Sequence, residues 1–104
     1  MAMIDLVKDK QDSIRALCQR FRVRRLDLFG SAAGESFDPA TSDLDFLVEF
    51  QEFPNGGIAD AYFGLREELC RLFQREVDLV SVAAVKNPYL RSAIERSKEL
   101  LYAA

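Results

Sequence analysis

The sequence predicts a small α/β domain in which a β-sheet packs against amphipathic helices. Two short runs rich in branched and aromatic residues, Leu44–Phe50 and Glu76–Val82, flank a stretch of helical period, which is the order of a β-α-β unit. A composition of 49% hydrophobic and 30% charged residues is typical of a folded globular protein. Because 104 residues suit one hydrophobic core, we expect residues 1–104 to form a single domain.

The first part of the chain predicts a helix followed by a strand. Apolar residues recur at helical spacing over residues 3–21, so we expect one amphipathic helix there. The run Arg24–Phe29 then alternates, with its two leucines facing one way and Asp27 and Phe29 the other, which indicates a strand.

The rest of the chain predicts strand, helix, strand and helix. The strands are Leu44–Phe50 and Glu76–Val82, and the helix between them starts after the break "PNGG" and runs through about Gln74. Asn87 and Pro88 are typical of the cap and first turn of a last helix. The closing "LLYAA" is either one more helical turn or a short edge strand.

The composition excludes several classes of function. A net charge of −3 offers no basic surface to a long nucleic acid, so none is expected as a partner. The absence of histidine excludes Ser-His-Asp and Cys-His nucleophiles and most zinc sites, which leaves carboxylates to carry any chemistry. No apolar run approaches the ~20 residues of a membrane span. The lone Cys18 and Cys70 are interpreted as core residues in a reducing compartment, so we expect a cytoplasmic protein.

Three aspartates are the candidate chemical groups. Asp43 and Asp45 stand at the start of one predicted strand, although aspartate is depleted in strands. Because side chains alternate, both point to the same side, close enough to reach one cation. Mg²⁺ prefers oxygen ligands of this kind, and its charge would relieve the repulsion between the two carboxylates. Asp78, in the next predicted strand, is the third candidate, and the right-handed crossover would bring it into the same sheet.

Gly30 and Ser31 offer a place for phosphates. Glycine lets the backbone approach an anion closely, and a short helix opening at residues 31–36 directly after a strand would present free N–H groups. Each feature has an ordinary alternative, since Asp-x-Asp is often a solvated strand edge and Gly-Ser a plain turn. Their order along the chain favours a joint site that uses two metals for nucleotidyl transfer.

This pattern resembles the nucleotidyltransferase superfamily of DNA polymerase β, and most closely the minimal nucleotidyltransferase (MNT) proteins of prokaryotes. The matching stretches are "LDLFGSAAG", "TSDLDFLVEF", "EVDLVS" and "NPYLRSAI", which cover nearly the whole chain. The resemblance implies a mixed sheet with helices packed on one side, and a nucleoside triphosphate, ATP or another, held over Gly30 and Ser31. It also implies Mg²⁺ on Asp43, Asp45 and Asp78.

Many MNT proteins are antitoxins paired with a helical HEPN ribonuclease, and some transfer AMP from ATP to a tyrosine of that toxin. On this resemblance the partner would be a HEPN toxin and the acceptor a tyrosine hydroxyl. The alternative is an antitoxin that neutralises its partner by binding alone. An aminoglycoside- or RNA-modifying enzyme is less favoured, because such enzymes usually carry a further domain for the acceptor.

The chain departs from the family pattern in two ways, and one is that the loop before Asp43 is one residue longer than the common spacing. Gly34 stands where the family often has an arginine after Gly-Ser, a change that could weaken phosphate binding. Four arginines are candidates to replace it: Arg22, Arg24, Arg25 and Arg66. The sequence leaves the nucleobase preference, the number of nucleotides transferred and the oligomeric state open.

Overall fold

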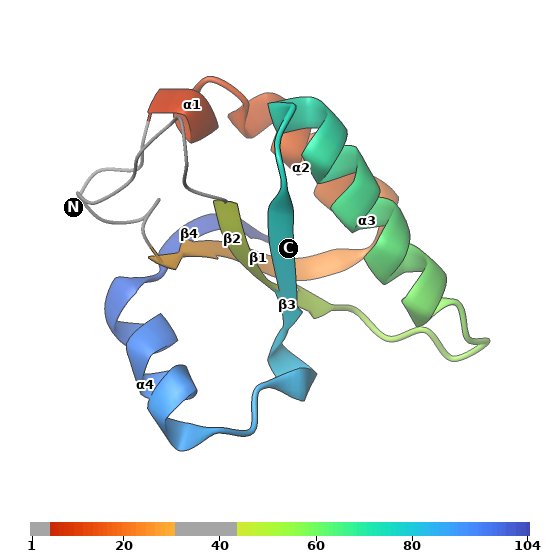
Figure 1. Ribbon diagram of the computed structural model, residues 1–104. Helices are drawn as coiled ribbons and strands as arrows, with labels where there is room; N and C mark the ends of the chain where they lie inside the picture. Colours follow the sequence, from red (N-terminus) through yellow and green to blue (C-terminus); the bar gives the residue numbers. More distant parts are fainter. Residues whose placement is uncertain (1–4, 31–43) are drawn as a thin grey trace.

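The computed structural model describes residues 5–30 and 44–104, and its centre is a four-stranded mixed sheet (Figure 1). The strand order is β3-β2-β1-β4, in which β1 pairs antiparallel with β2 and β4, and β2 pairs parallel with β3. The predicted mixed α/β fold is therefore confirmed. The elements are α1 (Asp5–Lys8), α2 (Gln11–Arg20), β1 (Val23–Phe29), β2 (Leu44–Phe50), α3 (Ile58–Phe73), β3 (Val77–Ser81), the short 3₁₀ turn η2 (Val82–Ala84), α4 (Pro88–Ser97) and β4 (Glu99–Ala103).

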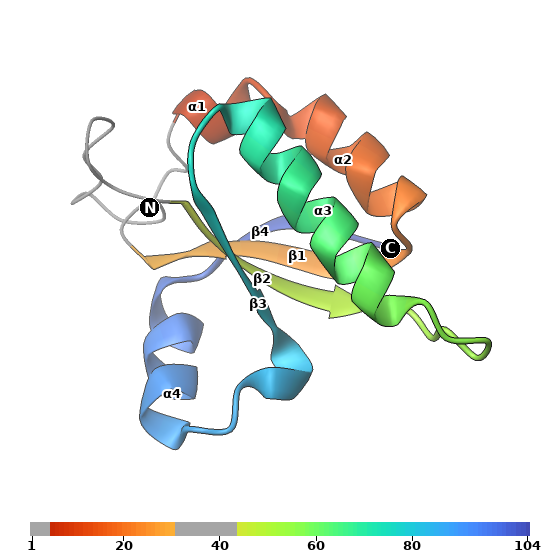
Figure 2. The ribbon, with the colours of Figure 1, turned by 45° about the vertical axis from the view of Figure 1, so that its right-hand side comes forward.

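The helices divide between the two faces of the sheet. The predicted layer on one side is formed by α2 and α3, while α4 lies on the opposite side, as both views show (Figures 1 and 2). We call the side under α2 and α3 the core face, because alternate strand residues there join the hydrophobic core. The largest fully buried side chains of the core are Phe46, Ile14, Leu26, Leu28, Leu44, Leu65 and Leu69.

The N-terminal helix is broken in two, so the prediction of one helix over residues 3–21 was wrong. The turn between α1 and α2 is closed by the N–H of Lys10, which donates to the carbonyl of Val7 at 3.0 Å. The polar run "DKQD" at residues 9–12 gives a continuous helix nothing apolar to bury over that turn, whereas the apolar repeat begins at Ile14.

The first strand starts one residue before its predicted start. A register shift between Val23 and Arg25 adds a residue on the β1 side of its ladder with β2. Val23, which is out of step with the alternation that follows it, is fully buried in the core as a result.

The C-terminal half agrees closely with the sequence. Strand β2 has the predicted bounds, and the side chain of Asn87 caps α4 by accepting the N–H groups of Tyr89 at 2.9 Å and Leu90 at 3.5 Å. Of the two alternatives for the last residues, the edge strand is correct, because β4 pairs with β1. None of the described helices is long and apolar enough to cross a membrane.

Candidate functional site

Two of the three predicted acids meet across neighbouring strands. In the parallel ladder of β2 and β3, Asp45 is the register partner of Asp78. Adjacent strands lie about 4.8 Å apart, so both carboxylates can reach one small ion. The expectation that Asp78 joins the same sheet is therefore confirmed, and β3 is the immediate neighbour of β2. Asp45 is half-buried and Asp78 exposed.

Both acids lie on the face opposite the core. Leu44 and Phe46, on either side of Asp45, are fully buried, and the residues that flank Asp78 are buried as well. Alternation then turns the two carboxylates away from α2 and α3. We call this second side of the sheet the site face.

Gly30 lies against the carboxylate of Asp45. It follows the last residue of β1, Phe29, which pairs with Asp45. Gly30 has φ +75°, and a Cβ added there would stand 2.5 Å from Oδ2 of Asp45. Glycine is therefore required twice over, by the left-handed backbone and by the space that the carboxylate occupies.

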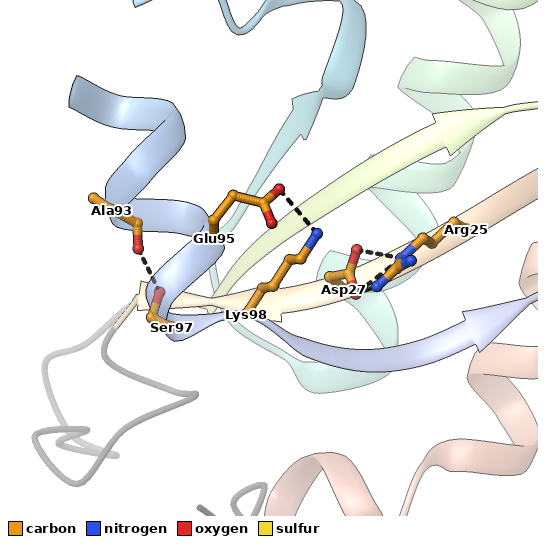
Figure 3. A network of polar contacts seen from close by, with 6 residues as sticks. All are labelled: Arg25, Asp27, Ala93, Glu95, Ser97 and Lys98. Carbon is orange, nitrogen blue, oxygen red and sulfur yellow. Dashed lines mark hydrogen bonds and ion pairs between the residues drawn. The ribbon is translucent and has the colours of Figure 1, made fainter. Parts of the chain in front are cut away.

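The backbone N–H of Gly30 is engaged by α4. It donates to Oγ of Ser97 at 3.4 Å, and that hydroxyl donates to the carbonyl of Ala93 at 3.1 Å. Figure 3 shows the second bond at the end of α4. The end of the last helix thus touches the start of the predicted phosphate-binding turn.

The remaining predicted site residues, Asp43 and Ser31, lie outside the described residues, as do Gly34 and the short helix expected at residues 31–36. Within residues 5–30 and 44–104 there is no group of three or more metal-ligating side chains. The described part of the site is therefore the Asp45–Asp78 pair beside Gly30.

An ion pair on the site face, between the buried Asp27 and the partly exposed Arg25, was missed by the sequence analysis. Asp27 is 2% exposed, and the guanidinium of Arg25 donates to both of its carboxylate oxygens, with Nε 3.0 Å from Oδ2 and Nη2 3.2 Å from Oδ1 (Figure 3). These hydrogen bonds and the negative charge of Asp27 raise the pKa of Arg25. The signal available in the sequence was the Arg-x-Asp spacing, which places both side chains on one face of a strand.

Three of the four arginines that could replace the missing family arginine have partners elsewhere. Arg25 is held by Asp27, the guanidinium of Arg22 lies 5.0 Å from the ring centre of Phe53, and Arg66 lies 4.0 Å from the carboxylate of Glu76. The structure therefore singles out none of these three as the replacement.

A cavity of about 160 Å³ separates α4 from the site face. Leu47, two residues beyond Asp45 in β2, lies in its wall together with Asp27. The cavity is thus one step along the strands from the Asp45–Asp78 pair, on the same side of the sheet. Its lining consists of Arg25, Asp27, Leu47, Glu49, Val82, Val85, Arg91, Ile94, Glu95 and Lys98.

The donor set at Asp45 and Asp78 fits a hard divalent cation. Both donors are carboxylates in register, and the missing side chain of Gly30 leaves room at the oxygen of Asp45. Mg²⁺ binds through one or two carboxylates and fills its other positions with water and phosphate oxygens. A site of this composition can hold a metal-bound phosphate ester.

Comparison with known proteins places the chain in a family. Residues 11–101 match the family described as "Nucleotidyltransferase domain". The chain belongs to the nucleotidyltransferase domain family. The predicted family and the predicted enzyme class, nucleotidyltransferase, are confirmed by this match.

Relatives of this nucleotidyltransferase cover most of its length. A protein of Methanocaldococcus jannaschii that bears the provisional name protein adenylyltransferase is 36% identical over 88 residues, which are 85% of this chain and 84% of that protein. Protein adenylyltransferase MntA of Thermococcus cleftensis is 33% identical over 89 residues, 85% of this chain and 82% of that protein.

Solved structures share the fold of this nucleotidyltransferase. One that is provisionally named a minimal nucleotidyltransferase superimposes with a TM-score of 0.75 at 28% identity, covering 94% of this chain and 95% of the other. An MNT antitoxin solved in complex with the tri-AMPylated HEPN toxin of Shewanella oneidensis gives a TM-score of 0.65 at 19% identity, over 94% of this chain and 73% of that one. The second similarity concerns the fold alone.

Proposed function

We propose that this protein is a Mg²⁺-dependent adenylyltransferase that transfers AMP from ATP to a tyrosine hydroxyl of a partner HEPN toxin, and thereby acts as its antitoxin. The observation that carries the proposal is the Asp45–Asp78 pair, in register on adjacent parallel strands beside Gly30. The names of the relatives, protein adenylyltransferases at 33% and 36% identity, support the group transferred. The complex of an MNT antitoxin with a tri-AMPylated HEPN toxin supports the partner.

Each residue of the site has a proposed task. Asp43, Asp45 and Asp78 would hold the metal, in a site for two ions, and Gly30 and Ser31 would hold the triphosphate. Bound Mg²⁺ would neutralise charge on the phosphate oxygens and make the acceptor hydroxyl more acidic. The half-buried carboxylate of Asp45 would hold the metal in a defined place, because Gly30 restricts the position of that carboxylate.

The reaction itself is a substitution at phosphorus. The tyrosine oxygen forms a bond to the α-phosphorus of ATP, the bond from that phosphorus to the bridging oxygen breaks, and pyrophosphate leaves with its electron pair. The hydroxyl proton passes to the exposed carboxylate of Asp78 and on to water. We place this reaction in the cytoplasm, since Cys18 and Cys70 are both free thiols. We also propose that a single domain, residues 1–104, carries it out.

A second function, neutralisation of the toxin by docking alone, is favoured by one observation. Arg25, a candidate for the missing phosphate-binding arginine, is committed to Asp27. With less positive charge at the triphosphate, the transfer of AMP would be slow, and the protein would neutralise the toxin mainly by binding it.

Labelling of the toxin tests the proposal. The purified protein, Mg²⁺ and ATP labelled at the α-phosphate should label a HEPN toxin encoded beside it. Asp45→Asn and Asp78→Asn should each lower labelling by at least about a hundredfold, because each removes a charge that acts on the transition state. The matched control is Glu49→Gln, an acid on the same strand and the same face, which should label at the rate of the unmodified protein.

The outcomes separate the two functions. Labelling that survives in both aspartate variants would show that the acids are not catalytic. A protein that never labels the toxin but forms a stable complex with it, and blocks its ribonuclease activity, would support docking alone.

A further inference from the structure

The end of α4 and the end of β1 are joined by a side chain that the proposed chemistry does not use. Ser97 is the last residue of α4, 67 residues after Gly30 in the chain. Its hydroxyl accepts the N–H of Gly30 and donates to the carbonyl of Ala93, one turn earlier in the helix. Both hydrogen-bonding roles of the hydroxyl are therefore filled, one from each element.

Gly30 is the position at which such a restraint matters most. A glycine at φ +75° keeps more backbone freedom than any other residue, and the carboxylate of Asp45 occupies the space where a Cβ would be. Movement of this backbone toward Asp45 or away from it would change where that carboxylate lies. A hydrogen bond to the N–H of Gly30 limits such movement.

The restraint is anchored at its other end. Helix α4 is fixed at its start by the cap of Asn87 and on its inner side by Ile94, which is 3% exposed. Lys98 and Glu95 form a further ion pair at 3.0 Å on the last turn (Figure 3). The cap and the ion pair stabilise the helix itself, and the burial of Ile94 joins it to the rest of the protein. The hydroxyl of Ser97 thus belongs to a helix whose inner side is packed in the fold.

We propose that Ser97 is a positioning residue for nucleotidyl transfer, which ties Gly30 to α4 and so holds the backbone of Gly30 in place beside the carboxylate of Asp45. The inference rests on the proposed function for its catalytic consequence, but the restraint itself belongs to the protein without nucleotide or metal. It also gives Gly30 two roles. Its N–H is hydrogen-bonded to Ser97, and its lack of a side chain leaves space for the carboxylate of Asp45.

The test compares Ser97→Ala with Ser97→Thr, which keeps the hydroxyl, and with Ser92→Ala, which makes the same change on an exposed serine of the same helix. The first measurement is amide hydrogen exchange of Gly30 by NMR in protein free of nucleotide and metal. We expect exchange about tenfold faster in Ser97→Ala, and unchanged exchange in the other two.

The second measurement is function. For Ser97→Ala we expect the affinity for a non-hydrolysable ATP analogue with Mg²⁺, measured by calorimetry, to fall about three- to tenfold, with the KM for ATP rising by the same factor. Ser97→Thr should restore both values, and Ser92→Ala should leave both unchanged. The thermal midpoint of Ser97→Ala should fall by a few degrees, because one hydrogen bond is lost, so the affinity and the KM decide whether Ser97 positions the site. A merely structural serine would change the midpoint and not the affinity.

Three results would overturn the inference or its basis. Unchanged exchange at Gly30 in Ser97→Ala would show that the bond does not restrain the turn. Faster exchange with unchanged affinity and unchanged KM would show that the restraint does not position the site. A protein that binds the analogue and responds to Ser97→Ala, yet never transfers AMP, would refute the proposed function and leave the positioning role standing.

Discussion

The core face and the site face are built by the same strands but have opposite chemistry. On the core face, Leu28 and Phe46 are fully buried beneath α2 and α3. On the site face, the described parts of those strands and of their neighbour β3 present four carboxylates, those of Asp27, Asp45, Glu49 and Asp78. Because successive side chains of a strand point to opposite faces, this difference needs no change in the backbone conformation.

The difference shows where stability and chemistry reside in so small a protein. The core face contributes most of the apolar burial, so a change there acts on folding. Carboxylates placed side by side contribute little to folding and can even oppose it, because like charges repel and lose water on burial. The sheet tolerates them because its other face is well packed.

The largest expected effect is a loss of stability caused by a substitution on the core face. Phe46→Ala should lower the free energy of unfolding by about 3–5 kcal/mol, because the ring is fully buried and stacks on Phe73 with ring centres 5.9 Å apart. Urea unfolding followed by circular dichroism measures it. Glu49→Ala on the site face should change the same quantity by less than about 0.5 kcal/mol. Equal losses in the two variants would contradict the division between the faces.

The next effect acts on the site face alone. Gly30→Ala should reduce toxin labelling about a hundredfold, because its Cβ would displace the Asp45 carboxylate by about 1 Å. Gly56→Ala is the matched control: its φ of +85° imposes the same backbone strain, but no atom lies within 4 Å of the added Cβ. It should lose stability without losing activity. Equal activity in the two variants would argue against a close contact between Gly30 and Asp45.

The smallest expected effect is a pH dependence of the free energy of unfolding, which arises from a cysteine in the core. Burial raises the pKa of the Cys18 thiol from its ordinary value of 9.0 to about 12. The unfolded chain therefore ionises first, so the contribution of Cys18 is complete below pH 9 and is lost as the pH rises toward 12. The loss between pH 9 and pH 10 should be about 1 kcal/mol.

Urea unfolding at pH 8, 9 and 10 measures this loss, and Cys18→Ala is the reference that removes it while all other groups still titrate. Parallel curves for the two proteins would contradict the burial of a neutral thiol. Iodoacetamide should in addition modify the partly exposed Cys70 and leave Cys18 unreacted in the folded protein.

Local patterns in the sequence predicted what depends on neighbouring residues. The bounds of β2, the cap at Asn87 and the side of the strand on which Asp45 lies all follow from alternation and turn chemistry, and the structure agrees. That Asp78 would be the register partner of Asp45 did not follow, because strand pairing after a crossover is a contact between distant segments.

Contacts between elements could not be predicted from the sequence, for the same reason. The helical repeat places Ser97 on the stripe of Leu90 and Ile94 and leaves Ser92 off it, but it does not say that the hydroxyl of Ser97 would meet Gly30, which is 67 residues away in the chain. The Arg25–Asp27 pair is local, yet its burial depends on α4, which covers it from the site face. Asp43 and Ser31 stay predictions.

The parallel register of β2 and β3 has a consequence for insertions and deletions. Loss of one residue within β3 would turn either Asp78 or the leucine after it to the wrong face, exchanging charge for an apolar side chain in a single step. The connection at residues 51–57 sets no such register, and a longer loop there would cost little closure entropy. A peptide tag grafted at Gly56 should therefore leave the acids aligned, whereas an insertion or deletion within β3 should separate them.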